Sequence, residues 1–196
     1  MTTSSSPDDD RWILRALELA ARGRYGTSPN PMVGAIVLDA AGRVAGEGFH
    51  AVCGGPHAEV VALATARDRA RGGTLYVTLE PCAHHGRTPP CVDAILAAGL
   101  ARVVVALRDP NPAAAGGVER LRAEGLEVTV VNGAAAGAAR MLNRRWLVAM
   151  RELRRYFDRH AAEYPGLAGI AARMPSPTGL VETIGRCITD SGEVAD

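Results

Sequence analysis

The sequence Pro-His-Ala-Glu at positions 56–59, followed by Glu-Pro-Cys at 80–82 and a second cysteine, Cys91, determines how the whole chain is interpreted. One imidazole and two thiolates, from His57, Cys82 and Cys91, form a sufficient ligand set for Zn²⁺. Catalytic zinc sites keep three protein ligands and leave a fourth position open for water. An isolated histidine or cysteine usually only packs, but the three together predict one zinc ion per chain.

Glu59 lies two residues after the proposed ligand His57, where it could transfer protons without binding the metal. A His-x-Glu pair followed by Pro-Cys and a further cysteine is the pattern of zinc-dependent nucleobase deaminases. In that pattern the glutamate acts as general acid and base, and this is the role predicted for Glu59. The alternative is that Glu59 only faces solvent on a helix.

The two cysteines are further apart than this pattern requires. The usual form is Pro-Cys-x-x-Cys, whereas residues 83–90 separate Cys82 from Cys91 here. With its long insert, segment 78–91 closely resembles the pyrimidine deaminase domain of the bacterial riboflavin-biosynthesis deaminase/reductase. Ser-Pro-Asn-Pro-Met-Val-Gly at 28–34 and Asp-Pro-Asn-Pro at 109–112 resemble two further motifs of that domain. The resemblance extends from about residue 12 to about residue 150.

The resemblance implies a site for an aminopyrimidine that carries a ribose phosphate. The residues expected to contact this substrate are Asn30, His50, His84, Arg87, Asp109 and Asn111. Arg87 suits the phosphate because its guanidinium is always charged and can donate two parallel hydrogen bonds. For Asn30 and Asp109 the alternative is a conformational role in turns beside proline. The loop after Asp109 is shorter than is usual in the family, which bears on the ribose-phosphate end.

The implied reaction is zinc-dependent hydrolytic deamination of 2,5-diamino-6-ribosylamino-4(3H)-pyrimidinone 5′-phosphate, with release of ammonia in riboflavin biosynthesis. One alternative is the same type of deaminase in a riboflavin- or pteridine-like secondary-metabolite pathway. Another, of a different class, is a catalytically retired homologue that binds a ligand or a partner. About 46 residues follow position 150 and contain no nucleotide-binding glycine pattern, so no NADPH is expected.

Composition restricts the class of partner. A chain of 196 residues with 47% hydrophobic and 22% charged residues is typical of a globular protein. A net charge of +1 and 4% aromatic residues argue against nucleic acid as a partner. No apolar run approaches the ~20 residues of a membrane helix, and the N-terminus does not resemble a signal peptide. We expect a cytoplasmic protein and, by analogy with small deaminases, a homodimer or homotetramer.

The order of predicted elements indicates an α/β protein with a mixed sheet. Strands are expected at 33–38, 44–49, 74–79, 102–107 and 127–131, and helices at 11–22, 57–71, 92–98 and 118–123. The first two strands form a hairpin about a short turn at 39–42. The resemblance implies a three-layer α/β/α cytidine deaminase-like fold with about five strands.

Three regions are expected along the chain. Residues 1–9 are polar and predicted to be disordered, with Asp10 capping the first helix, and 10–150 form the deaminase domain. Residues 151–196 form a helical extension of unknown role. The span from about residue 134 is expected to be helical, with an apolar stripe formed by Leu142, Trp146, Met150, Leu153 and Phe157. This stripe is expected to pack in the core or at a subunit interface. The alternative is a basic helix that lies on a membrane surface. Cys53 and Cys187 are expected to be plain thiols.

Overall fold

The computed structural model describes residues 6–84, 89–111 and 114–160. A five-stranded mixed sheet with strand order β2-β1-β3-β4-β5 forms its centre. β1 (Gly34–Leu38) is antiparallel both to β2 (Val44–Phe49), its hairpin partner, and to β3 (Thr74–Val77). β3, β4 (Arg102–Val105) and β5 (Glu127–Val130) are mutually parallel. Because parallel neighbours end at the same edge of a sheet, the segments that follow β3 and β4 come together.

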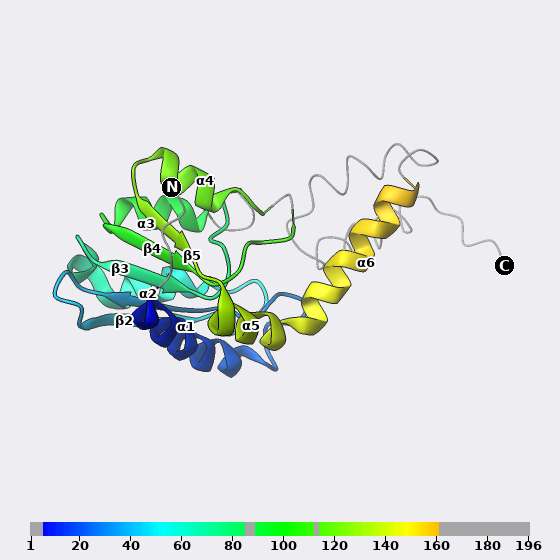
Figure 1. Ribbon diagram of the computed structural model, residues 1–196, viewed down its shortest axis with the longest axis horizontal. Coiled ribbons are helices and arrows are strands. Elements are labelled where there is room, and N and C mark those ends of the chain that lie inside the picture. The colour runs from blue at the N-terminus through cyan, green and yellow to red at the C-terminus, as the bar shows by residue number, and fades with distance from the viewer. Residues whose placement is uncertain (1–5, 85–88, 112–113, 161–196) are drawn as a thin grey trace.

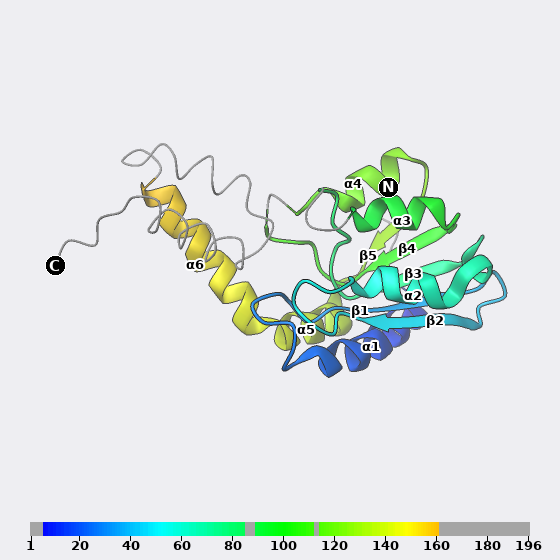
Figure 2. The same ribbon diagram turned by 180° about the vertical axis from the view of Figure 1, so that it is seen from behind.

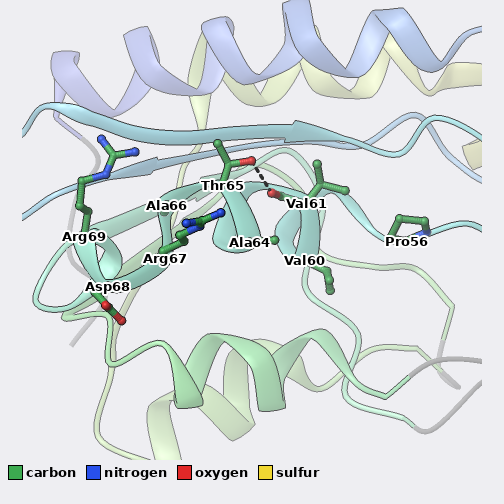
Figure 3. A pocket seen from close by; sticks show the side chains of 9 residues that line it. All are labelled: Pro56, Val60, Val61, Ala64, Thr65, Ala66, Arg67, Asp68 and Arg69. Carbon is green, nitrogen blue, oxygen red and sulfur yellow. Dashed lines mark hydrogen bonds between the residues drawn. The ribbon is translucent and has the colours of Figure 1, made fainter.

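Helices cover both faces of this sheet, which confirms the expected three-layer α/β/α fold (Figures 1 and 2). α1 (Pro7–Ala20) and α5 (Gly133–Leu142) lie on one face. α2 (Ala58–Ala66), α3 (Cys91–Ala97) and α4 (Gly117–Ala123) lie on the other. Figure 3 shows the sheet between α1 and α2.

Short 3-10 turns at Ala21–Gly23 and Arg67–Ala70 extend α1 and α2. α6 (Arg144–His160) follows α5 and extends away from the sheet (Figure 1). None of the helices in the described part of the chain has the length and apolar character required to cross a membrane.

The core is built on strands that are buried on both faces. Val103, Val104 and Val105 of β4 are completely inaccessible to solvent, as their unbroken apolar run predicts. Each such side chain contributes about 1.5–3 kcal/mol through removal of apolar surface from water. The central strands are therefore a firm base for the residues that follow them.

Glycines in β2 allow α2 to lie directly against the strand backbone. A Cβ at Gly46 would lie 2.2 Å from the carbonyl oxygen of Ala62, and one at Gly48 would lie 2.5 Å from that of Ala58. The helix presents alanine at Ala58, Ala62 and Ala66, all of which are buried. The small residues on both elements therefore fix the position of α2 and of the residues at its N-terminus.

The first helix begins earlier than the sequence analysis predicted. The hydroxyl of Ser6 accepts a hydrogen bond from the Asp9 amide at 3.1 Å, and Asp9 Oδ2 accepts one from the Ser6 amide at 2.9 Å. This capping box starts α1 at Pro7, so the predicted cap at Asp10 and the predicted disorder of residues 6–9 are wrong. Residues 1–5 lie outside the described part of the chain.

The predicted helical span after about residue 134 consists of two helices divided at Asn143. Of the predicted apolar stripe, Met150 is buried and Leu142 and Trp146 are partly buried against the core. The side chains of Leu153 and Phe157 lie outside the described residues. Residues 161–196, including Cys187, also lie outside the described part of the chain, so the helical extension predicted for 151–196 stays a prediction beyond His160.

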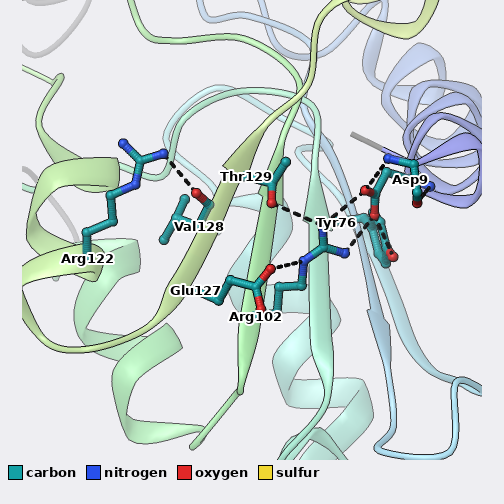
Figure 4. A network of polar contacts seen from close by, with 8 residues as sticks. Asp9, Tyr76, Arg102, Arg122, Glu127, Val128 and Thr129 are labelled. Atoms are coloured by element: carbon teal, nitrogen blue, oxygen red, sulfur yellow. Dashed lines mark hydrogen bonds and ion pairs between the residues drawn. The ribbon is translucent and has the colours of Figure 1, made fainter. Parts of the chain in front are cut away.

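Asp9 also joins α1 to the sheet through the polar network in Figure 4. Its carboxylate accepts hydrogen bonds from Arg102 Nη1 at 2.7 Å and Nη2 at 3.0 Å, and from the Tyr76 hydroxyl at 3.2 Å. Arg102 in turn donates to Glu127 and Thr129. Burial alone would raise the pKa of Asp9, but the hydrogen bonds from Arg102 and Ser6 outweigh it and lower the pKa below its usual value.

We expect Asp9→Asn to lower the free energy of unfolding by about 2–3 kcal/mol at pH 7, less than for a fully buried ion pair because Arg102 is partly exposed. The pKa of Asp9 is lowered in the folded state, so its stabilisation is present above the unfolded pKa and is lost as pH falls below about 4. Urea unfolding of both proteins at pH 7 and pH 3 measures this. An equal difference at the two pH values would contradict the assignment.

Candidate metal centre

Three structural elements bring the predicted metal ligands together. His57 immediately precedes α2, Cys82 follows β3, and Cys91 is the first residue of α3. Their ligand atoms all lie within 4.8 Å of one another. Nδ1 of His57 is 3.1 Å from the Cys91 sulfur and 3.6 Å from the Cys82 sulfur, so Nδ1 is the ring nitrogen that faces both thiols.

The chemistry and spacing of these donors fit Zn²⁺. Tetrahedral coordination with ordinary Zn–S and Zn–N bonds places neighbouring ligand atoms about 3.5–3.8 Å apart. The separations around His57 Nδ1, 3.1 and 3.6 Å, are close to this requirement. The main-chain amide of Cys91 also donates to the Cys82 sulfur at 3.3 Å, which favours negative charge there.

The two thiols have opposite tendencies to ionise. A hydrogen bond from the Cys91 thiol, supported by His57 and by the Cys91 amide, lowers the pKa of Cys82 below its usual value. The same hydrogen bond, together with burial, raises the pKa of Cys91. The neighbours of Cys82 therefore favour its thiolate, which is the form that binds a metal.

Glu59 is buried rather than exposed on the helix surface. It lies in the first turn of α2, only 3% of its surface is accessible, and its carboxyl interacts with the thiol of Cys91. This burial contradicts the alternative that Glu59 faces solvent. Burial raises the pKa of Glu59 to about 7, and a carboxyl group with a pKa near neutrality can both accept and donate a proton.

Glu80 is a buried carboxylate to which the sequence analysis assigned no role. Oε2 accepts a hydrogen bond from the Asp109 amide at 3.0 Å, and Oε1 accepts from the amides of Gly116 at 3.1 Å and Val118 at 3.0 Å. Arg108 adds a charged donor at 3.3 Å. Glu80 therefore attaches the segment after β4 and the start of α4 to the residue that precedes Pro81 and Cys82.

This attachment holds Asp109 near the predicted ligand Cys82, with Asn111 beside Asp109. Oδ1 of Asp109 accepts a hydrogen bond from the Asn111 amide at 2.8 Å, which is the turn geometry that the sequence allowed as an alternative. Burial, reinforced by the charges of Glu80 and Cys82, raises the pKa of Asp109 to about 7 despite that hydrogen bond. Asn111 is only 5% exposed.

Asn30 and His50 approach the same centre from the loops that flank β1 and β2. Nδ1 of His50 lies 3.0 Å from the carbonyl oxygen of Pro56, and Nε2 lies 3.4 Å from Nδ2 of Asn30. Burial lowers the pKa of His50, so the ring is neutral; with Nδ1–H donating to Pro56, Nε2 accepts from Asn30. The His50 and His57 rings meet edge to face, with centroids 5.6 Å apart.

His84 lies two residues after Cys82, and its Nδ1 is buried with no hydrogen-bond partner among the described residues. Arg87 lies outside the described part of the chain. The sequence analysis did not identify Glu80 as a residue that organises the site. A charged residue directly after a predicted buried strand was nevertheless a usable signal. If such a carboxylate is itself buried, it needs several hydrogen-bond donors around it.

We expect Cys91→Ala to weaken zinc binding by more than about 100-fold. Removal of a residue that only hydrogen-bonds to a metal ligand typically weakens binding by about 10–100-fold, and loss of a ligand itself should have a larger effect. Metal content after dialysis against a weak chelator measures this, with circular dichroism as the check on folding. Cys53→Ala is the matched control and should retain one zinc ion per chain. Stoichiometric, equally tight zinc in Cys91→Ala would show that this cysteine is not a ligand.

The chain matches known deaminase sequences over most of its described part. Residues 6–107, just over half of the chain, match the family described as "Cytidine and deoxycytidylate deaminase zinc-binding region". The riboflavin biosynthesis protein RibD of Escherichia coli (strain K12) is 51% identical over 144 residues, which are 73% of this chain and 38% of that protein. The chain thus spans about two fifths of the length of this longer relative.

A shorter relative and a solved structure give the same result. The diaminohydroxyphosphoribosylamino-pyrimidine deaminase of Buchnera aphidicola subsp. Schizaphis graminum is 44% identical over 62% of this chain and 83% of that protein. The crystal structure of the deaminase/reductase from Thermotoga maritima superimposes with a TM-score of 0.69 at 44% identity, over 74% of this chain and 41% of that one.

Proposed function

The chain belongs to the cytidine and deoxycytidylate deaminase zinc-binding family, and we propose that it hydrolytically deaminates an aminopyrimidine ribotide, 2,5-diamino-6-ribosylamino-4(3H)-pyrimidinone 5′-phosphate, in riboflavin biosynthesis. The observation that carries this proposal is the cluster of His57, Cys82 and Cys91 with the buried carboxyl of Glu59 beside it. The 51% identity to a protein named for riboflavin biosynthesis and the 44% identity to one named as a diaminohydroxyphosphoribosylamino-pyrimidine deaminase support the choice of substrate.

Zn²⁺ bound by the three ligands would supply the Lewis acidity that makes water nucleophilic near neutral pH. Glu59 accepts a proton from the attacking water and delivers it to a ring nitrogen of the substrate. Glu59 then accepts the proton of the hydroxyl group added at the amino-bearing carbon and passes it to the amino group, so that the carbon–nitrogen bond breaks as the carbonyl group forms. The products are ammonia and a carbonyl group at the former 2-amino carbon. A carboxyl group with a pKa of about 7 suits this alternation of roles.

The substrate would be held from two sides of the metal centre. Asn30 and His50 approach on the side of the loops next to β1 and β2, whereas Asp109 and Asn111 approach from the segment after β4. We assign the phosphate to Arg87, on the basis of its charge and position in the sequence motif, and a further polar contact to His84. Reduced thiols as metal ligands and a phosphorylated substrate are both consistent with a cytoplasmic location.

We expect Glu59→Gln to reduce kcat by about 10²–10⁴-fold, because the amide is nearly isosteric but cannot transfer protons. Ammonia release from the pyrimidine ribotide, followed with zinc-loaded protein, measures the effect. The variant should keep one zinc ion per chain and its thermal stability, since an amide is easier to bury than a carboxylate.

Retention of most of the activity in Glu59→Gln would exclude Glu59 as the proton carrier. A wild-type protein that holds zinc but does not release ammonia would favour another aminopyrimidine of a secondary-metabolite pathway, and then the catalytically retired homologue.

The protein is further proposed to assemble as a homodimer or homotetramer through the outer face of α2. This helix is almost entirely apolar, although only one of its faces packs on the sheet. Val60 and Ala64 are exposed, and together with Val61 and Thr65 on the flank of the helix they line an open groove (Figure 3). A helix that is apolar all round is normally buried on all sides.

We expect Ala64→Arg to shift the assembly towards a monomer of 20.5 kDa, because the new charge lies in the middle of the proposed interface. Light scattering coupled to gel filtration measures the mass. Leu14→Arg, on the exposed side of α1, is the control and should leave the mass unchanged. A wild-type protein that is already monomeric would contradict the interface.

A further inference from the structure

Asn143 makes a two-point contact with a segment 111 residues earlier in the chain. Its Oδ1 accepts a hydrogen bond from the Met32 amide at 2.9 Å, and its Nδ2 donates one to the Met32 carbonyl at 2.8 Å. The side chain is only 2% exposed. Both ends of the amide are therefore used, in a pairing that resembles one rung of a sheet, and each satisfies a main-chain group just before β1.

The backbone of Asn143 is itself held firmly. Its amide donates to the Ala139 carbonyl at 3.2 Å, and its carbonyl accepts from the Leu147 amide at 2.9 Å, so it belongs to the end of α5 and the start of α6 at once. α5 packs against α1 on one face of the sheet. The side chain of Asn143 thus projects from a rigid site and can fix the position of Met32.

Met32 ends a short segment that carries Asn30. The main-chain amide of Asn30 donates a hydrogen bond to the Thr27 carbonyl at 2.7 Å, which fixes the beginning of the segment. The side chain of Asn143 fixes its end at Met32. Pro29 and Pro31 on either side of Asn30 restrict the backbone between these two points. A displacement of the main chain at Met32 would therefore displace Asn30 by a similar amount.

Asn30 is linked in turn to the metal centre. Its Nδ2 lies 3.4 Å from His50 Nε2, and His50 Nδ1 lies 3.0 Å from the carbonyl oxygen of Pro56, the residue before the ligand His57. We propose that Asn143 is a positioning residue that sets the distance between the substrate-binding Asn30 and the metal ligands through the main chain of Met32. This inference rests on the proposed function, because it treats Asn30 as a contact of the pyrimidine.

The proposal predicts a separation of substrate binding from chemistry. Glu59 lies on α2, and the three proposed metal ligands lie immediately before α2, after β3 and at the start of α3, whereas the hydrogen bonds of Asn143 go to Met32, Ala139 and Leu147. Asn143→Ala should therefore raise KM for the pyrimidine ribotide by about tenfold and change kcat by less than about threefold, with one zinc ion retained.

The variant Asn143→Gln distinguishes two roles of Asn143: positioning Asn30, or only providing hydrogen-bond partners for the main chain of Met32. Glutamine keeps both amide groups but moves them outward by one methylene, so Met32 can be paired only if its segment shifts. Positioning predicts a raised KM in this variant, with folding preserved. A merely structural role predicts wild-type kinetics, because the buried polar groups of Met32 still find partners.

Two further measurements complete the test. In an Asn30→Ala background, Asn143→Ala should raise KM further by a factor of less than about two, because Asn143 is proposed to affect KM only by positioning Asn30. Asp9→Asn is the stability control: it removes a buried ionic partner at the opposite end of β4 from Asp109 and should leave KM unchanged. Wild-type KM in both Asn143 variants, or an equal rise in Asp9→Asn, would overturn the proposal.

Hydrogen exchange provides a readout that does not require turnover. Loss of Asn143 should accelerate exchange of the Met32 amide, while the amides of the β3 and β4 ladder keep their protection. If the wild-type protein binds zinc but does not deaminate the ribotide, the proposed function fails, and faster exchange at Met32 still supports the positioning contact. Unchanged exchange at Met32 in Asn143→Ala would overturn it in either case.

Discussion

The close packing of α2 against β2 is the constraint on which the site depends. Gly46 and Gly48 leave no side chain between strand and helix, and the alanines of α2 occupy the remaining space. This close packing fixes the helix against the strand, so that His57, immediately before the helix, and Glu59, in its first turn, lie near Cys82 beyond the end of β3. The same packing removes Glu59 from solvent, which places its pKa near neutrality. The position of the helix and the raised pKa of Glu59 thus have one common cause.

Glu80 provides a comparable constraint on the opposite side of the site. A buried carboxylate without partners would be costly, and here three main-chain amides and Arg108 satisfy it. Those amides belong to the segment that leads from Asp109 into α4. The burial of one charge therefore holds Asp109, Gly116 and Val118 close to the segment that carries Cys82.

Local sequence patterns predicted most of the fold because the relevant forces are local. The limits of β2 and of its hairpin follow from the two strand-forming segments and the short turn at Asp39–Gly42, and the predicted metal ligands follow from residue type and order. The capping box at Ser6 was missed because Asp10 offers an equally good local signal. Glu80 and Asn143 could not be assigned roles, since their partners lie 29 and 111 residues away and tertiary packing alone brings them together.

The residues of the proposed site fall into two groups: those on packed helices and strands, and those on loops that side-chain hydrogen bonds hold in place. The metal ligands and Glu59 are attached to α2, to α3 and to the end of β3, elements whose packing tolerates little change. Asn30, His50 and Asp109 lie on the connecting segments, which side-chain hydrogen bonds hold individually. Loops of this kind can change without disturbing the core beneath them. In the proposed deamination, the rigid elements would hold the groups that act on the amino group, and the separately held loops would contact the ring that carries it.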